Sequence, residues 1–512
     1  MVRSSRLMTV AVVAGLGLAG CGGGGSSTGG TGGSGASGSV VLGSLVPPTS
    51  YAASGAGWAN ESLLQQAVYD TLLHADPSGK IVPWLATEWS WNDTKTVLTL
   101  KLRTDVTFTD GTKFDADAAA KNLLRFRDGT APNKSFLAAV TDAKAVDAAT
   151  LQITLKQPDP AMLTYLTQAP GLMESPKHFG AADEKTNPIG TGPYVLDTTK
   201  TVVGSSYAYT ANPNYFAKDQ QHWKNLTIKV ITTPATEVNA IKGGQIDGMN
   251  VIDATTVAQI KGAGYTVVDH ELDWAGMAIF DRGGKLVPAL KDPKVRQAIN
   301  YAVDRAGLLK AAAQGNGTVT SSVFPTYSPG FDQAVDQSYT YDPAKAKQLL
   351  AEAGFPSFTM TLPQVPGLGQ VQNDLLKQYL GAVGITVKYV TVPLNNVIAD
   401  LLAGKYPAAN FQLQEDPTAW QESNFLLTTD ATFNPFKVPD TTVDGLVKTI
   451  QTGSDADVAT ATKNLNKYVT EQAFMAPYYR VKGFWAQSSK ITAEPQAGNA
   501  IPYLYSVTPA KG

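Results

Sequence analysis

The sequence predicts an α/β or α+β architecture with more than one lobe. Segments in which apolar and polar residues alternate, as in strands, are interleaved with segments that have helical spacing and a capping residue in front. At 512 residues the chain is long enough for two or three domains around separate cores. Hydrophobic residues make up 43% and charged residues 16%, which is a globular rather than a disordered balance. This mixed order of elements indicates an architecture of more than one lobe.

Strands are predicted where apolar residues recur at every second position. Leu98, Leu100 and Leu102 share one face of a strand over 97–102. Further strands are predicted around Leu151, Ile153 and Leu155 and over 226–231, 385–392 and 409–414.

Helices are predicted where a capping residue precedes apolar residues at helical spacing. In two of them the capping carboxylate is followed by a proline, whose missing N–H costs nothing at the first helical position. A glycine at the end of one helix readily adopts the left-handed conformation of a helix terminus. The expected helices are capped by Asn60 before 61–73, by Asp115 before 116–126, by Asp292 before Pro293, and by Asp342 before Pro343 with Gly354 at the end.

The N-terminus has the pattern of a secretory signal. Arg3 and Arg6 precede the uncharged run 7–20, which is shorter than the roughly 20 residues that span a bilayer as a helix. The run ends in Leu-Ala-Gly before Cys21, which resembles the lipobox of bacterial lipoproteins. We therefore predict a signal peptide over 1–20 and lipidation at Cys21. The alternative is an ordinary signal peptide with an incidental cysteine.

A tether is predicted after the lipidation site. Every residue of 22–38 is Gly, Ser, Thr or Ala, so 21–38 is expected to be a lipidated cysteine followed by a flexible linker. Two or more acyl chains hold a protein stably at a membrane. Cys21 is the only cysteine, so no disulfide is expected in the mature fold. No other run has transmembrane length and no phosphate-binding loop motif occurs, which argues against a permease or an ATPase.

Composition and motifs argue against nucleic-acid binding and against catalysis. The formal net charge is -2 and no basic cluster stands out, so no nucleic-acid partner is expected. The four histidines have no i,i+4 pair, and neither a zinc-protease motif nor a nucleophile elbow occurs. A G-x-G-x-x-G pattern lies at 15–20, inside the signal peptide. We expect no enzyme, no cofactor and no metal site. The enzyme class that scattered acidic residues leave open is a glycoside hydrolase.

Five blocks of sequence occur in order between about Val41 and about Tyr505. They are 69–73 with 79–86, Trp89, 100–103 and 106–112; 188–194 with 212–216; 244–247; 292–305; and 341–354. These blocks resemble the extracytoplasmic solute-binding proteins of the peptide/nickel type, bacterial family 5. The first block and the helix that follows it contain the family's signature, which is a strand ending in Leu-Arg, a Phe, an Asp-Gly turn and a helix capped by an Asp, here Asp115.

Most of the matching residues are expected to have structural roles. Asp110 and Gly111 would form a turn. Gly190 and Gly192 would allow a close approach of the backbone. Arg296 would anchor its helix.

The resemblance implies a two-lobed clamshell of the type II periplasmic-binding-protein class, in its large three-domain peptide-binding form, with mixed sheets. The expected boundaries are 39–60, 186–275 and 481–512 for a split domain I, 61–185 for an inserted domain II, and 276–480 for domain III, with a hinge near 273–274 and 483–485. A monomer on the extracytoplasmic face of the cell membrane would then capture a small-molecule solute between its lobes for the permease and ATPase subunits of an ABC importer. The solute would be peptide-like, or alternatively an oligosaccharide.

Ligand pockets of soluble binding proteins are lined by aromatic residues and a few fixed polar groups. The candidate ligand-binding residues are Trp58, Trp274, Gln412, Gln414, Glu415, Asp416, Trp420 and Trp485. The four tryptophans lie in loop or hinge segments that face the cleft in this family, and ligand contact and core packing are both open for each. The remaining tryptophans, expected in the core, are Trp84, Trp89, Trp91 and Trp223.

The segment 411–420 bears on the class of solute. Its Asp416-Pro417 resembles the Asp-Pro of the family's cleft loop, and in dipeptide and oligopeptide binders an Asp about three residues earlier pairs with the peptide's α-ammonium. Here that position is Leu413. Because a desolvated ammonium without a counter-charge is costly, either Glu415 or Asp416 substitutes, or the ligand has no free α-amino group. The amides and indole of this segment suit a neutral polar solute such as an oligosaccharide. A nickel complex is not favoured, since the sequence has no histidine cluster.

Overall fold

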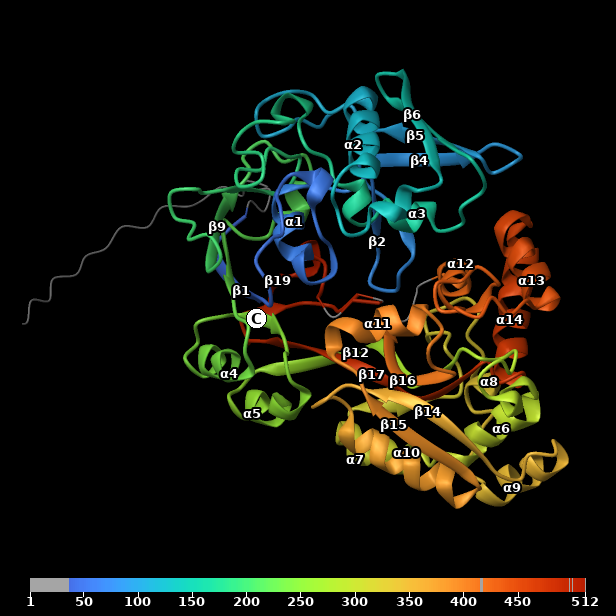
Figure 1. The fold of residues 1–512 in the computed structure, drawn as a ribbon. Coiled ribbons are helices and arrows are strands. Elements are labelled where there is room, and N and C mark those ends of the chain that lie inside the picture. The colour runs from blue at the N-terminus through green and yellow to red at the C-terminus, as the bar shows by residue number, and fades with distance from the viewer. Residues whose placement is uncertain (1–35, 415–417, 497, 500, 512) are drawn as a thin grey trace, which may run out of the picture. The chain divides into compact units, whose positions relative to one another are not determined.

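The largest sheet of the fold takes its strands from widely separated parts of the chain (Figure 1). The computed structural model describes residues 36–414, 418–496, 498–499 and 501–511. Within them the strands of this sheet are β1 (Ser39–Ser44), β8 (Tyr194–Leu196), β9 (Ser206–Ala211), β10 (Asn225–Val230), β11 (Gly248–Asn250), β12 (Thr266–Ile279), β13 (Gly317–Val319), β16 (Ala408–Gln414) and β17 (Met475–Gln487). Their order is β16-β12-β17-β11-β1-β10-β9-β8, and β13 also pairs with β17. β1 runs parallel to β10 and β11 while the other pairs are antiparallel, so the sheet is mixed, as predicted.

Four smaller sheets accompany it in the described residues. They are β4 (Ala86–Trp91), β5 (Val97–Leu102), β7 (Thr150–Leu155) and β6 (Val140–Asp147); β14 (Phe358–Gln364) and β15 (Ile385–Thr391); β2 (Leu73–Ala75) and β3 (Ile81–Pro83); and β18 (Ile491–Thr492) and β19 (Thr508–Pro509). β14 and β15 are parallel, whereas the four-stranded sheet is antiparallel. The predicted strands agree with β5, β7, β10, β15 and β16 to within one residue at each end.

Helices connect and cover these sheets. They are α1 (Ser62–Val68), α2 (Ala116–Asp128), α3 (Met162–Tyr165), α4 (Pro234–Lys242), α5 (Val257–Gly262), α6 (Pro293–Ala302), α7 (Arg305–Ala313), α8 (Gln333–Asp336), α9 (Pro343–Glu352), α10 (Gln370–Ala382), α11 (Leu394–Leu402), α12 (Ala419–Glu422), α13 (Thr441–Thr452) and α14 (Asp455–Glu471). Figure 1 shows α2 beside the four-stranded sheet, where it packs against β6 and β7.

Capping side chains begin three of the predicted helices. Asp115 accepts a hydrogen bond from the backbone N–H of Ala118 at 2.9 Å and starts α2. Asp292 and Asp342 start α6 and α9 in the same way, each before a proline. Gly354 follows α9 with a φ of +78°, in the left-handed region that glycine tolerates. The predictions for these helix starts and for the glycine terminus are confirmed.

The predicted helix over 61–73 is wrong in its length and in its cap. A short 3₁₀ turn precedes α1, and the Asn60 side chain makes no capping bond. Apolar residues keep helical spacing to the end of the predicted range, but backbone groups near that end form hydrogen bonds with distant segments instead of helical ones. The N–H of Leu72 donates to the carbonyl of Gly171 at 2.9 Å, so the chain leaves the helix five residues early.

Two of the family-matching features have the structural roles expected of them. A Cβ on Gly190 or Gly192 would lie 2.1 Å or 2.4 Å from the backbone of Val68, so neither position has room for a side chain. The buried Arg296 guanidinium donates to the carbonyls of Leu290 and Gln472, among others, at 2.8 Å each. It thereby ties α6 to two other segments of the chain.

Buried apolar side chains form four clusters in the described residues, which belong to one compact unit over 35–512. The first cluster joins side chains of the predicted domain II to side chains of the predicted domain I, so these two share a core. The second and third clusters lie within 274–479. The fourth gathers residues of 231–267 with Phe484 and Ala486. The three-domain boundaries stay a prediction.

Candidate functional site

Two long strands connect the parts of the chain that hold different clusters. β12 and β17 pair antiparallel along most of their lengths, with a register shift before Asp273. β12 packs Val267 against the fourth cluster and places Met277 in the second. The predicted hinge positions near 273–274 and 483–485 therefore lie inside a hydrogen-bonded ladder rather than in loops.

A cavity of about 540 Å³ lies beside these strands. Its size falls within the range of small-molecule sites, which are typically a few hundred to a thousand Å³. Its lining comes from segments far apart in the sequence and is rich in amides and aromatic rings. The side chains concerned include Trp58, Asn60, Asn133, Phe136, Gln168, Asn250, Asp273, Gln421, Lys482, Phe484, Gln496, Asn499 and Tyr503. Such a surface can stack on flat or apolar groups and hydrogen-bond to neutral polar ones.

Two charged side chains stand among the described residues that line this cavity. Lys482 forms an ion pair with Asp269 on the neighbouring strand. Asp273 accepts a hydrogen bond from Gln412 Nε2 at 2.6 Å, and burial raises the pKa of its carboxyl. No ion pair with Asp273 is formed within the described residues. A half-buried carboxylate therefore faces the cavity with one neutral donor.

The four candidate tryptophans do not come together. Trp58 is half-buried and lines the cavity, as a ligand-contacting residue must. The side chains of Trp274 and Trp485 are fully buried, in the third and first clusters. Of the two roles that the sequence leaves open for each of them, this burial favours core packing. Each sits on a strand with neighbours on both sides, β12 or β17, so its indole packs between layers.

The other candidates lie on or after β16. Gln412 is exposed and bonded to Asp273, while Leu413, the position of the family's ammonium-binding Asp, is buried in the third cluster opposite Trp274. Trp420 on α12 is half-buried and packs against both the first and the third clusters. The side chain of Gln414 and the residues Glu415 and Asp416 lie outside the described residues.

A column of stacked rings supports one wall of the cavity. Trp84 stacks on His74 with ring centroids 4.0 Å apart, His74 on Tyr505 at 4.6 Å, and Tyr505 on Tyr503 at 5.0 Å. Tyr503 ends the column at the cavity. Burial lowers the pKa of His74 to about 3, so its imidazole is neutral and packs as an aromatic ring.

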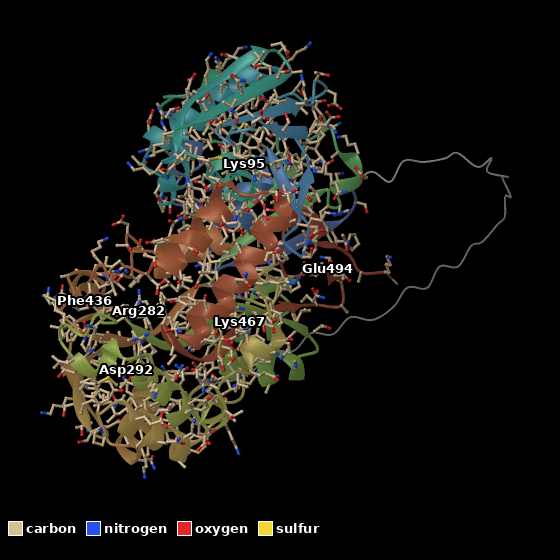
Figure 2. All side chains as sticks on the ribbon, turned by 90° about the vertical axis from the view of Figure 1, so that its right-hand side faces the viewer. Lys95, Arg282, Asp292, Phe436, Lys467 and Glu494 are labelled. Carbon is tan, nitrogen blue, oxygen red and sulfur yellow. The ribbon has the colours of Figure 1, made fainter. Side chains whose placement is uncertain are left out.

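Polar contacts also join the four-stranded sheet region to the turn between α13 and α14. Lys95, on the turn between β4 and β5 and labelled in Figure 2, donates to the carbonyl of Gly453 at 2.6 Å. Gln451 donates to the carbonyl of Pro158 at 3.1 Å. Together with Trp420, these contacts connect segments that pack in different clusters.

Sequence reasoning missed most of the cavity lining. Asn133, Gln168 and Asn250 belong to no motif and lie in three separate segments, so only the fold brings them together. Asp273 carried a signal, since it stands beside Trp274 where the chain was expected to cross between lobes.

No helix in the described residues is both long and apolar enough to cross a membrane. In that same part of the chain, no cluster of three or more His, Cys, Asp or Glu side chains could hold a metal ion.

Comparison with known proteins gives the family. The family model described as "Bacterial extracellular solute-binding proteins, family 5 Middle" matches residues 80–434 of this chain. The nickel-binding periplasmic protein of Escherichia coli (strain K12) is 29% identical over 337 residues, which cover 64% of this chain and 62% of that protein, less than two thirds of its length. The glutathione-binding protein GsiB of Shigella flexneri serotype 5b (strain 8401) is 30% identical over 365 residues, covering 67% of this chain and 68% of that protein.

Solved structures show the same fold. HbpA2 from Haemophilus parasuis superimposes with a TM-score of 0.82 at 20% identity, covering 93% of this chain and 100% of that one. The ABC transporter substrate-binding protein CtaP from Listeria monocytogenes gives 0.78 at 21% identity, with the same coverage. The fold is thus the predicted type II periplasmic-binding-protein class, with mixed sheets. The chain belongs to the bacterial extracellular solute-binding proteins of family 5, which bind solutes and are not enzymes.

Proposed function

We propose that the chain is the substrate-binding lipoprotein of an ABC importer and captures a peptide-like solute in the 540 Å³ cavity. The observation that carries this proposal is the lining itself, in which amides and aromatic rings of the predicted domains I and II face one space together with Gln421 of the predicted domain III. Amides such as Asn250 and Gln168 can pair with the N–H and C=O groups of a peptide backbone. The 30% identical relative is named as a glutathione-binding protein, and glutathione is a tripeptide.

Capture would couple binding to closure. A solute that contacts the predicted domain III as well as the predicted domains I and II gains its full set of contacts only when these two parts of the protein approach each other. Its binding energy then shifts an equilibrium between open and closed forms. Contacts such as that between Lys95 and Gly453 would strengthen the closed form. Permease and ATPase subunits would be the partners that distinguish the two forms.

An oligosaccharide is the second candidate solute. Trp58, Phe136 and Tyr503 line the cavity, and aromatic rings of this kind stack on the apolar faces of sugars. The amides that would pair with a peptide backbone can equally pair with sugar hydroxyls.

A thermal-shift screen tests the class of solute. Protein comprising residues 36–512 is mixed with glutathione, tri- and pentapeptides, maltotriose and cellotriose. Binding to the native state raises the melting temperature by mass action, and we expect this with peptides. A shift with the oligosaccharides alone would replace the peptide by the second candidate. No saturable shift with either class would contradict the proposed function.

The lipid anchor is a separate prediction. Cys21 and the rest of 1–35 lie outside the described residues, so the proposal rests on the lipobox and the glycine-rich tether. Expressed in a bacterium, the native chain should partition into the detergent phase through its acyl chains, and Cys21→Ser should move it to the aqueous phase. Ser26→Ala, a neighbouring change in the tether, is the matched control and should leave the partition unchanged. A Cys21→Ser protein that stays in the detergent phase would place the anchor elsewhere.

A further inference from the structure

A second cavity, of about 390 Å³, lies at the carboxyl ends of the parallel strands β14 and β15. It is bounded by the start of α10, by α11 and by β16. In open α/β arrangements, ligands bind in the crevice outside the carboxyl ends of the strands. The second cavity lies at the corresponding place of the two-stranded sheet formed by β14 and β15.

The rim of the second cavity exposes large apolar side chains. Leu394 is 64% exposed, Leu368 is 54% exposed and Ile398 is 41% exposed, and all three line the cavity. Leu394 and Ile398 are four residues apart on α11, so they form an apolar stripe on the free face of that helix. Clustered exposed apolar side chains on a soluble protein mark a surface that binds something. Here they surround a hollow large enough for the apolar group of a small molecule.

The two cavities meet at one hydrogen bond. Gln412 lines the second cavity, and its Nε2 donates at 2.6 Å to Asp273, which lines the first. Gln412 pairs in register with Ala275, which also lines the second cavity. Since side chains two residues apart on a strand share a face, Asp273 points to the same face of the sheet as Ala275. One solute can therefore run from one cavity to the other along this face.

The charge at the junction favours a cation. Asp273 is the only carboxylate among the described residues that line the first cavity. The lysine of that lining, Lys482, already has Asp269 as its partner. A half-buried carboxylate without a cation partner costs free energy, and a cationic group beside it offsets that cost.

We propose, on the basis of the solute-binding function above, that the two cavities form one extended site for an amphipathic cation. Its ammonium or guanidinium group pairs with Asp273, and its apolar group fills the cavity at the ends of β14 and β15. A peptide with a free amino terminus and large aliphatic side chains belongs to this class.

Three tripeptide amides test the proposal by calorimetric titration of residues 36–512. They are Leu-Leu-Leu-amide, its N-acetylated form, which lacks the cation, and Gly-Gly-Gly-amide, which lacks the apolar groups. We expect Leu-Leu-Leu-amide to bind about tenfold or more tighter than either of the others, because each lacks one of the two contacts. Asp273→Asn should make the free and acetylated leucine peptides bind alike.

Matched variants separate the site from general effects. Ile398→Asn should weaken Leu-Leu-Leu-amide by about tenfold. Leu402→Asn is its control, since Leu402 lies one turn further on α11, is also 41% exposed and does not line the cavity. Glu352→Gln is the control for the carboxylate, since Glu352 lines neither cavity and its partner Lys294 does not either. Equal affinity for the three peptides, no binding of any of them, or equal losses in the controls would overturn the proposal. The proposed function is decided separately, by the wider screen of peptides and oligosaccharides.

Discussion

Trp274→Ala is expected to lower the free energy of unfolding by about 3–5 kcal/mol, as large-to-small changes of buried aromatic residues do. Trp274 is fully buried in the third cluster, and its indole N–H has no hydrogen-bond partner in the described part of the chain. The change therefore removes packing and leaves a cavity without breaking a polar contact. Denaturant unfolding followed by circular dichroism measures the loss. The affinity of the remaining folded protein for its solute should change little.

Trp58→Ala is the matched comparison. It should lower the free energy of unfolding less, and the solute affinity more, than Trp274→Ala does. Trp58 is half-buried at the wall of the first cavity, so its removal costs less packing but takes away a ring that a solute can stack on. We expect solute affinity to fall by about 1–3 kcal/mol, as for aromatic anchors at interfaces. If Trp274→Ala instead weakens binding as much as Trp58→Ala at equal stability, the assignment of Trp274 to packing is wrong.

Asp336→Asn is expected to destabilise the fold by about 3–5 kcal/mol, as is typical when one partner of a buried ion pair is removed. Arg480 has no exposed side-chain surface and makes two hydrogen bonds to the Asp336 carboxylate, at 2.8 Å and 3.1 Å. Glu271 lies 3.7 Å from the same guanidinium, farther away than the Asp336 carboxylate. Arg480 stands on β17 directly before the residues that line the first cavity, so the pair also fixes that wall. Thermal and denaturant unfolding measure the effect.

Glu352→Gln provides the control for this prediction. Glu352 and Lys294 form an ion pair at 2.9 Å between side chains that are 39% and 48% exposed. Solvent screens such a pair, so its loss should change stability far less than the loss of the buried one. Comparable losses in the two variants would mean that burial is not what makes the Asp336 pair important.

Elements set by local signals were predictable from the sequence. Asp115, Asp292 and Asp342 each offer a carboxylate to the free N–H groups of a helix start, and this needs no tertiary information. The alternation in 97–102 predicted β5 without error for the same reason. The helix over 61–73 ended early because a distant carbonyl, that of Gly171, competes for its backbone.

The candidate site was predictable only in part. Trp58 was selected because aromatic residues mark pockets, and it lines the cavity, whereas Trp274 and Trp485, selected by the same rule, are buried in apolar clusters. The crossing segments were expected to form a hinge, and the structure shows that they are paired strands in which Trp274 and Trp485 are fully buried. Amides such as Asn250 and Gln168 have no local signature, since their role depends on which distant segments the fold brings beside them.

Small-angle X-ray scattering, with and without a saturating solute from the screen, tests the central claim that the protein closes on one bound solute. Residues 36–512 are measured in both states, after calorimetry has established one solute per chain. The radius of gyration should decrease on binding, because a solute that contacts the predicted domain III as well as the predicted domains I and II stabilises the closed form. An unchanged radius of gyration at proven saturation would contradict capture by closure.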